Sequence, residues 1–175
     1  MILNLHGIDG KANNTNFREI RKIYPDVTVV SPQIDYYNTP PETLIAELME
    51  TGKSAELVIG NSFGGFFAYL LCGMLKCKCI LTNPCIPPDA YIPDPLQDYQ
   101  RAYVEEMNKM LSESDINMDD VYVILGINDT VLSPQLTKQT LNPKHLWEVP
   151  DDHILCSDEF LSVFRNTVKE IVDFG

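Results

Sequence analysis

LVIGNSFGGFFAYLLCGML, residues 57–75, is the stretch of sequence that decides the fold. It begins with a short, β-branched apolar run, Leu57 to Ile59, which is typical of a buried strand. A glycine-bounded turn follows, and residues 63–75 are apolar on every side, as expected of a helix buried at the centre of a protein. A buried strand that leads directly into a buried helix is typical of parallel α/β sheets.

Short apolar runs alternate with stretches of helical spacing along the rest of the chain. The other expected strands are residues 2–5, 27–30, 79–81, 121–125 and 146–149. The other expected helices are residues 16–24, 40–49, 96–111, 134–141 and 157–174. The strand runs are continuous rather than alternating, which favours strands covered on both faces. The alternation predicts right-handed crossovers and an α/β fold, a three-layer α/β/α sandwich with a six-stranded, mainly parallel sheet in one domain over residues 1–175.

One segment breaks this pattern. Five prolines occur among the twelve residues 84–95, at positions 84, 87, 88, 93 and 95. Proline lacks an amide hydrogen and is excluded from the middle of helices and sheets. We therefore expect a rigid loop over the edge of the sheet.

The charge balance argues against two classes of partner. The chain has 13 basic and 25 acidic residues, a formal net charge of −12. Such a field repels phosphate backbones and anionic lipid, so we expect neither nucleic-acid nor membrane binding. The longest apolar run, residues 66–75, is shorter than the roughly 20 residues needed to span a bilayer. The 175 residues can bury a sizeable core without a disulfide or a metal.

The cysteines indicate a reducing compartment. There are five, an odd number, and the start of the sequence lacks the basic and apolar regions of a signal peptide. The pair Cys77 and Cys79 has the wrong spacing for a redox or zinc motif. We expect the cysteines to be small apolar core residues, the protein to be cytoplasmic, and no metal or organic cofactor to be required.

Residues 60–64 form a G-x-S-x-G motif between the predicted strand and the predicted helix. This context is the one that a nucleophile elbow requires, because the sharp turn exposes the serine at a helix N-terminus. The alternative is a phosphate-binding loop, but the lysine of such loops is absent. Ser62 is therefore the candidate nucleophile.

A serine hydroxyl needs a base, and the chain has three histidines. Residues that follow parallel strands share one edge of the sheet, and His153 follows the sixth predicted strand. His145 precedes that strand, at the opposite edge, and His6 lies in the turn after the first strand, where we expect it to shape the loop.

The acid that orients the base should come from another strand end. Asp129 follows the fifth predicted strand and lies 24 residues before the candidate base, which leaves room for one helix and one strand. Asp151 and Asp152 are too close in sequence to His153 to reach its ring comfortably. The order serine, aspartate, histidine along the chain then agrees with that of sites built on a nucleophile elbow.

The backbone amides of Phe63 and Ile8 are the candidate oxyanion donors, since one follows the nucleophile and the other lies after the first strand. No long insertion is available to build a lid, so we expect a small, shallow pocket. Its expected walls are Ile8, Phe63, Cys85, Ile86 and Val131.

Together these motifs resemble the α/β-hydrolase superfamily. The residues that carry the resemblance are His6-Gly7, residues 60–65, Asn83-Pro84, Asp129 and Asp152-His153. More narrowly, the chain is similar over essentially its whole length to the small bacterial YqiA-like esterases. The resemblance implies a minimal sheet with little or no cap, activity on short carboxylic esters and acyl thioesters, and the roles of nucleophile, acid and base for Ser62, Asp129 and His153. The sequence departs from that pattern at Phe63, where a smaller residue is expected, and at Ile8-Asp9, so the resemblance does not extend to the shape of the acyl pocket.

The sequence thus predicts a serine hydrolase that cleaves carboxylic esters or thioesters of short acyl chains through an acyl-enzyme on Ser62. Its partner would be a small-molecule substrate, and the protein a monomer or small homo-oligomer. Two alternatives stay open. One is a catalytically weak binding or interaction protein on the same scaffold. The other is a peptidase or acyltransferase that uses the same three residues.

Overall fold

A computed structural model describes residues 1–91 and 98–172 of the chain. These residues form a six-stranded sheet in the order β2-β1-β3-β4-β5-β6, and every neighbouring pair is parallel. The strands are β1 Ile2–Leu5, β2 Val29–Val30, β3 Leu57–Asn61, β4 Lys78–Thr82, β5 Val121–Gly126 and β6 His145–Val149. The helices are α1 Thr15–Ile23, α2 Pro41–Gly52, α3 Phe63–Leu75, α4 Asp98–Glu113, α5 Pro134–Leu141 and α6 Asp158–Ile171, with 3₁₀ helices η1 Pro88–Tyr91 and η2 Met118–Asp120. The α/β sandwich predicted from the sequence is confirmed.

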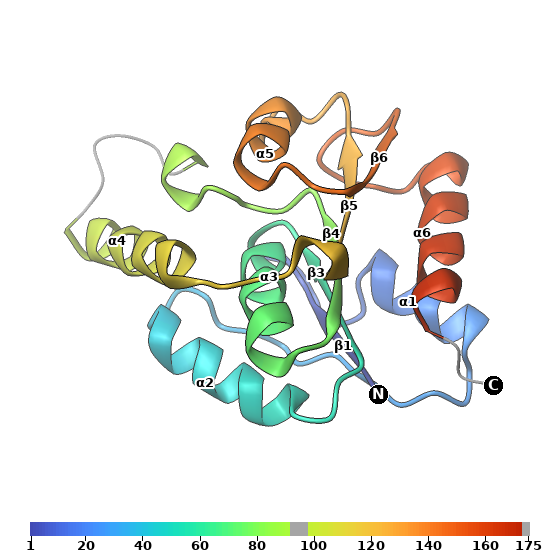
Figure 1. Ribbon diagram of the computed structural model, residues 1–175, viewed down its shortest axis with the longest axis horizontal. Helices are drawn as coiled ribbons and strands as arrows, with labels where there is room; N and C mark the ends of the chain where they lie inside the picture. The colour runs from blue at the N-terminus through green and yellow to red at the C-terminus, as the bar shows by residue number, and fades with distance from the viewer. Residues whose placement is uncertain (92–97, 173–175) are drawn as a thin grey trace.

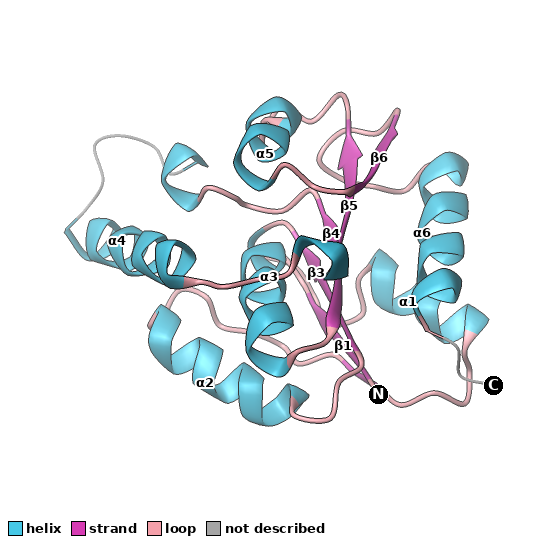
Figure 2. Cartoon of the chain, viewed as in Figure 1, coloured by secondary structure: helices cyan, strands magenta, loops and turns pink. Residues whose placement is uncertain are grey.

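Helices cover both faces of the sheet (Figures 1 and 2). Helices α1 and α6 pack together on one face, and α2, α3 and α4 lie on the other. Successive strand residues alternate between two apolar clusters. In β3, Val58 belongs to the cluster under α3, whereas Leu57 and Ile59 belong to the cluster under α6. The central strands are therefore buried on both sides, as their continuous apolar runs predict.

The two edge strands differ from that prediction. Strand β2 comprises only Val29–Val30, and both residues are half-buried, whereas a four-residue strand was expected from residue 27. In β6 only Val149 is buried. An edge strand has a neighbour on one side only, so its burial depends on the surrounding helices rather than on its own sequence.

Local sequence signals set the helix ends. The hydroxyls of Ser133 and Ser157 accept hydrogen bonds from backbone amides in the first turns of α5 and α6. Pro134 begins α5, where its missing amide hydrogen costs nothing. Helix α6 begins one residue after its predicted start and ends at Ile171. The prediction that it continues toward residue 174 is wrong, because Val172 already has an extended backbone. Helix α4 is described from Asp98, so the predicted start at residue 96 lies outside the described residues.

Two expectations about local structure need correction. Within the proline-rich segment, Pro88–Tyr91 form a 3₁₀ helix rather than a loop, since a single tight turn can begin with proline; its residues 92–95 lie outside the described part. Cys156 is exposed on the loop before α6, so it is not a core residue. The other cysteines, Cys72, Cys77, Cys79 and Cys85, are buried and unpaired, as predicted.

Among the described residues, no helix is both long and apolar enough to cross a membrane.

Candidate active site

Ser62 lies on a strained turn between β3 and α3. Its backbone has φ 52° and ψ −119°, a left-handed conformation that costs about 1–3 kcal/mol for a residue with a side chain. The turn is this sharp only because its neighbours are glycines. A Cβ on Gly60 would lie 2.4 Å from the carbonyl oxygen of Gly64, and a Cβ on Gly64 would lie 2.4 Å from that of His6. The turn therefore has the form of a nucleophile elbow.

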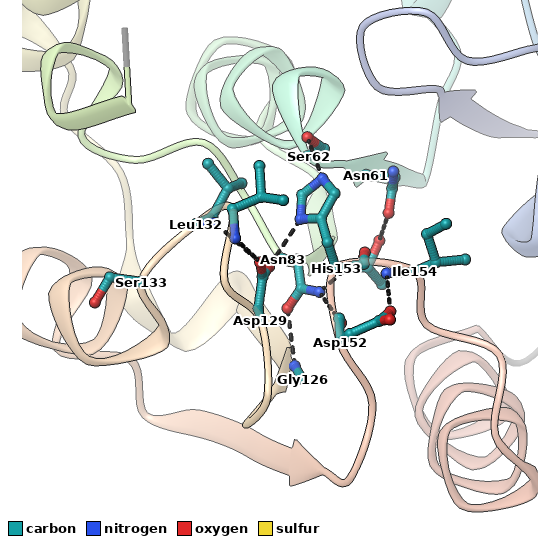
Figure 3. A network of polar contacts seen from close by, with 12 residues as sticks. Asn61, Ser62, Asn83, Gly126, Asp129, Leu132, Ser133, Asp152, His153 and Ile154 are labelled. Carbon is teal, nitrogen blue, oxygen red and sulfur yellow. Dashed lines mark hydrogen bonds and ion pairs between the residues drawn. The ribbon is translucent and has the colours of Figure 1, made fainter. Parts of the chain in front are cut away.

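Three side chains meet at the carboxyl edge of the sheet (Figure 3). The Nε2 atom of His153 lies 3.1 Å from the hydroxyl oxygen of Ser62, and its Nδ1 atom lies 2.8 Å from a carboxylate oxygen of Asp129. A carboxylate can only accept, so Nδ1 carries the ring hydrogen and the free lone pair of Nε2 faces the serine hydroxyl. The structure thus joins the predicted nucleophile, base and acid by one chain of hydrogen bonds.

The carboxylate of Asp129 is held in its ionised form. Burial raises its pKa, but hydrogen bonds from His153 and from the amides of Leu132 and Val131 outweigh that effect, and the pKa is lowered overall. The side chain is 1% exposed, so water does not compete with His153 for its oxygen. This environment favours a permanent negative charge beside the imidazole.

Asn83 lies in the site, although the sequence does not predict a role for its side chain. Its side-chain oxygen accepts a hydrogen bond from the amide of Gly126, 2.8 Å away, and its side-chain nitrogen donates to the carbonyl oxygens of Asp152 and His153 at 3.0 and 3.2 Å. The side chain therefore ties the end of β4 to the end of β5 and to the loop that carries His153 (Figure 3). The Asn83-Pro84 pair directly after a predicted strand is the sequence signal that points to it. Its backbone conformation, with φ 42°, is seen only in the structure.

The loop after β1 lies directly against the nucleophile. A Cβ on Gly7 would be 2.9 Å from the Cβ of Ser62. The carbonyl oxygen of Gly7 accepts hydrogen bonds from the Gly10 amide at 3.0 Å and from Nδ1 of His6 at 2.7 Å. The other ring nitrogen of His6 accepts from the Ile34 amide at 2.9 Å, so the buried ring is fully engaged in shaping this loop.

That loop also orients one of the two candidate oxyanion donors. The Gly7 carbonyl and the Ile8 amide belong to one planar peptide and point in opposite directions. Fixing the carbonyl therefore fixes the amide. Within the described residues, neither the Ile8 amide nor the Phe63 amide has a hydrogen-bond partner in the protein, so both are free to bind a ligand oxygen.

A cleft of about 780 Å³ opens around Ser62 and His153. Ile8, Phe63, Cys85 and Val131 line it, in the places that the sequence predicts. The prediction for Ile86 is wrong, because its side chain is fully buried in the core beneath α3 and does not reach the cleft.

The cleft is also larger than the small, shallow pocket that we expected. It extends along the loop after β2 and along α4, where Tyr36 and Tyr103 line it, and to Tyr91 in η1. No motif marks these tyrosines in the sequence, because they come from three separate segments that only the tertiary structure brings together.

The rival candidates have structural roles. His145 stacks on Tyr122 with ring centroids 4.3 Å apart, at the amino end of β6. Asp151 accepts hydrogen bonds from the amide and the hydroxyl of Ser157 before α6, and Asp152 accepts one from the amide of Ile154. Over the described residues, no group of three or more histidine, cysteine, aspartate or glutamate side chains is arranged to hold a metal ion.

The fold is that of the α/β-hydrolase class, and solved structures of this class superpose on the chain. Est1E from Butyrivibrio proteoclasticus is 16% identical with a TM-score of 0.68, covering 97% of this chain and 87% of its own. The esterase domain of a Rhodothermus marinus protein is 14% identical with a TM-score of 0.64, covering 97% and 84%. A serine hydrolase without a lid from Xanthomonas campestris is 14% identical with a TM-score of 0.54, covering 98% and 80%. At these identities the likeness shows the fold.

The sequence places the chain more narrowly: it belongs to the UPF0227 family, whose model, described as "Uncharacterised protein family (UPF0227)", matches residues 1–174. A UPF0227 protein of Shewanella sp. strain MR-7 is 28% identical over 151 residues, which cover 82% of this chain and 83% of the relative. Another, from Serratia proteamaculans strain 568, is 25% identical over 170 residues, covering 87% and 89%. The resemblance to YqiA-like α/β hydrolases is confirmed.

Proposed function

We propose that the protein is a serine hydrolase that cleaves carboxylic esters or thioesters of short acyl chains through an acyl-enzyme on Ser62. The observation that supports this most directly is the hydrogen-bonded chain from Ser62 through His153 to Asp129, placed at the wall of an open cleft. The named functions of the structural neighbours, esterases and serine hydrolases, agree with it. The substrate would be a small molecule, and the protein a cytoplasmic one.

The geometry accounts for each step of such a reaction. Nε2 of His153 takes the hydroxyl proton as the Ser62 oxygen bonds to the substrate carbonyl carbon, and the carbonyl oxygen becomes an oxyanion held by the amides of Phe63 and Ile8. His153 then gives that proton to the departing alcohol or thiol, which leaves the acyl group on Ser62. A water molecule loses a proton to His153, attacks the acyl-enzyme and releases the carboxylic acid, and Ser62 regains its proton. Throughout, Asp129 keeps the ring in the reactive tautomer and stabilises its cationic form.

A fluorophosphonate probe tests this proposal, because it forms a stable bond only with an activated serine. The wild-type protein, Ser62→Ala and Ser112→Ala would be treated with the probe and weighed intact by mass spectrometry. Ser112 is an exposed serine on α4 and serves as the matched control. We expect a single adduct on wild type and on Ser112→Ala, and none on Ser62→Ala.

Folded wild-type protein that takes up no probe would overturn the proposal and favour a binding protein on a hydrolase scaffold. If the adduct forms, p-nitrophenyl esters of increasing chain length, thioesters and peptides would then be compared. Transfer of the acyl group to an added alcohol or amine instead of to water would indicate an acyltransferase, and cleavage of peptides alone would indicate a peptidase.

A further inference from the structure

Three aromatic residues form one side of the cleft: Tyr36, Phe63 and Tyr103. We call them the ring wall. Phe63 is at their centre. Its ring meets that of Tyr36 edge to face with centroids 5.0 Å apart, and stacks on that of Tyr103 at 6.1 Å with the planes inclined by 30°. The rings come from the loop after β2, the start of α3 and the middle of α4, so the wall is held by three elements of the fold.

The ring wall offers the cleft carbon surface rather than hydroxyl groups. The hydroxyl of Tyr36 donates to the carbonyl oxygen of His6 at 2.5 Å, and the Tyr36 ring is only 4% exposed. The hydroxyl of Tyr103 is shielded from solvent and has no partner among the described residues, so it does not face the open cleft. Phe63 has no polar atom on its side chain. A group that lies along this wall therefore meets flat, apolar ring faces and edges.

The position of His153 decides which part of a substrate lies there. This step rests on the proposed function, in which His153 gives its proton to the departing alcohol or thiol. His153 follows β6, so the leaving group lies on the side of Ser62 toward β5 and β6. Tyr36 lies on the other side, since it follows β2 and its hydroxyl donates to the carbonyl oxygen of His6, directly after β1. Phe63 packs on Tyr36, and Tyr103 packs on Phe63, which completes the ring wall. The ring wall is therefore next to the acyl group.

We propose that the ring wall is an acyl-binding site for aromatic acyl groups, in which the ring of an arylacetyl or arylacryloyl ester packs against Phe63 and Tyr103. Rigid aromatic walls bind a flat ring better than an aliphatic group of the same size, because ring faces and edges carry opposite partial charges and attract one another in stacked and edge-to-face pairs. Phe63 is well placed for this contact, since its own amide is a candidate oxyanion donor and its ring begins one residue from the nucleophile.

Two esters that share a leaving group and a carbon count test the proposal: p-nitrophenyl phenylacetate and p-nitrophenyl cyclohexylacetate. The measured quantity is the ratio of their kcat/KM values, each divided by the rate constant for alkaline hydrolysis of the same ester to remove intrinsic reactivity. The ratio does not depend on the concentration of active enzyme. We expect the wild-type protein to favour the phenylacetate by about tenfold, the upper end of what aromatic pairs contribute.

Variants locate the source of that preference. Phe63→Leu and Tyr103→Leu should each lower the ratio by about threefold or more, since each removes one ring pair. Phe17→Leu is the control, because Phe17 is a half-buried phenylalanine of α1 that does not line the cleft, and its ratio should equal that of wild type.

A corrected ratio near one in the wild-type protein, with turnover that depends on Ser62, would overturn the aromatic preference and leave the proposed hydrolase standing. So would a ratio that neither Leu variant changes. Absence of turnover with both esters, together with absence of fluorophosphonate labelling, would instead overturn the proposed function and this inference with it.

Discussion

Replacing Asn83 with aspartate should damage the candidate active site without changing any of its three candidate catalytic side chains. Aspartate has nearly the same shape as asparagine and tolerates the same left-handed backbone, here φ 42°. Its carboxylate can still accept from the Gly126 amide. It cannot donate to the carbonyl oxygens of Asp152 and His153, and it places an oxygen where the amide nitrogen donates at 3.0 and 3.2 Å.

The expected loss of stability follows from the burial of the Asn83 side chain, since the residue is only 2% exposed. Two lost hydrogen bonds cost about 1 kcal/mol each, and carbonyl groups left without a donor add at least about 1 kcal/mol more, so unfolding should become easier by about 3 kcal/mol. The loop that carries His153 would also lose its attachment to β4. A displacement of about 1 Å at a catalytic group can cost about 100-fold in rate, so kcat should fall by about that factor while KM changes by less than about threefold.

Urea denaturation gives the stability change, and initial rates with a p-nitrophenyl ester give kcat and KM. Asn142→Asp is the matched control, because Asn142 has φ 44° at the end of α5, is exposed, and lies away from the cleft. The control should keep both wild-type values. A kcat for Asn83→Asp within threefold of wild type would refute the positioning role, even if the stability falls as expected, and unchanged stability would refute the hydrogen-bond argument itself.

Three further changes test other parts of the site. Ser62→Gly should raise the free energy of unfolding, measured by urea denaturation, by about 1 kcal/mol, because glycine has no Cβ to strain at φ 52°. Alanine keeps the Cβ, so an equal gain in Ser62→Ala would contradict the explanation by backbone strain. Asp129 has a lowered pKa, so its contribution to stability is present above the ordinary aspartate value of about 4 and is lost as the pH falls through the lower folded value. We therefore expect the difference in free energy of unfolding between wild type and Asp129→Asn to be constant from pH 7 downward and to shrink only below about pH 4. A difference that grew on acidification would mean that the pKa of Asp129 is raised rather than lowered. Gly64→Ala should destabilise the protein by about 3 kcal/mol in thermal or urea denaturation, because its Cβ would lie 2.4 Å from the backbone oxygen of His6, and a normal stability would mean that the elbow can widen.

The order of elements could be predicted from the sequence because its signals are local. Runs of apolar residues, prolines and glycines report on a few neighbouring residues, and these set the strands and the helix starts. The position of the candidate site was also predictable, since parallel strands place their carboxyl ends at one edge and the G-x-S-x-G turn marks that edge. Ser62, Asp129 and His153 follow three different strands, and the fold brings them within hydrogen-bonding distance.

Edge strands, pocket walls and supporting contacts could not be predicted in this way. Ile86 was expected to line the pocket, yet the chain turns its side chain into the core. Asn83 has no catalytic chemistry of its own, and its importance lies in contacts with residues 43 to 70 positions away in the chain. No local pattern encodes such contacts.

The sequence by itself determined a parallel α/β sheet, a turn of nucleophile-elbow form at Ser62 and the strand ends that carry Asp129 and His153, since each depends on the residue types in one short segment. The tertiary structure decided how those segments face one another: the Asn83 contacts that hold the His153 loop, the hydrogen bonds that fix the Gly7–Ile8 peptide beside Ser62, and the three rings that wall the cleft. The physical reason is that side-chain packing and buried hydrogen bonds join residues far apart in the chain. Their geometry exists only once the sheet and the helices on both its faces have come together.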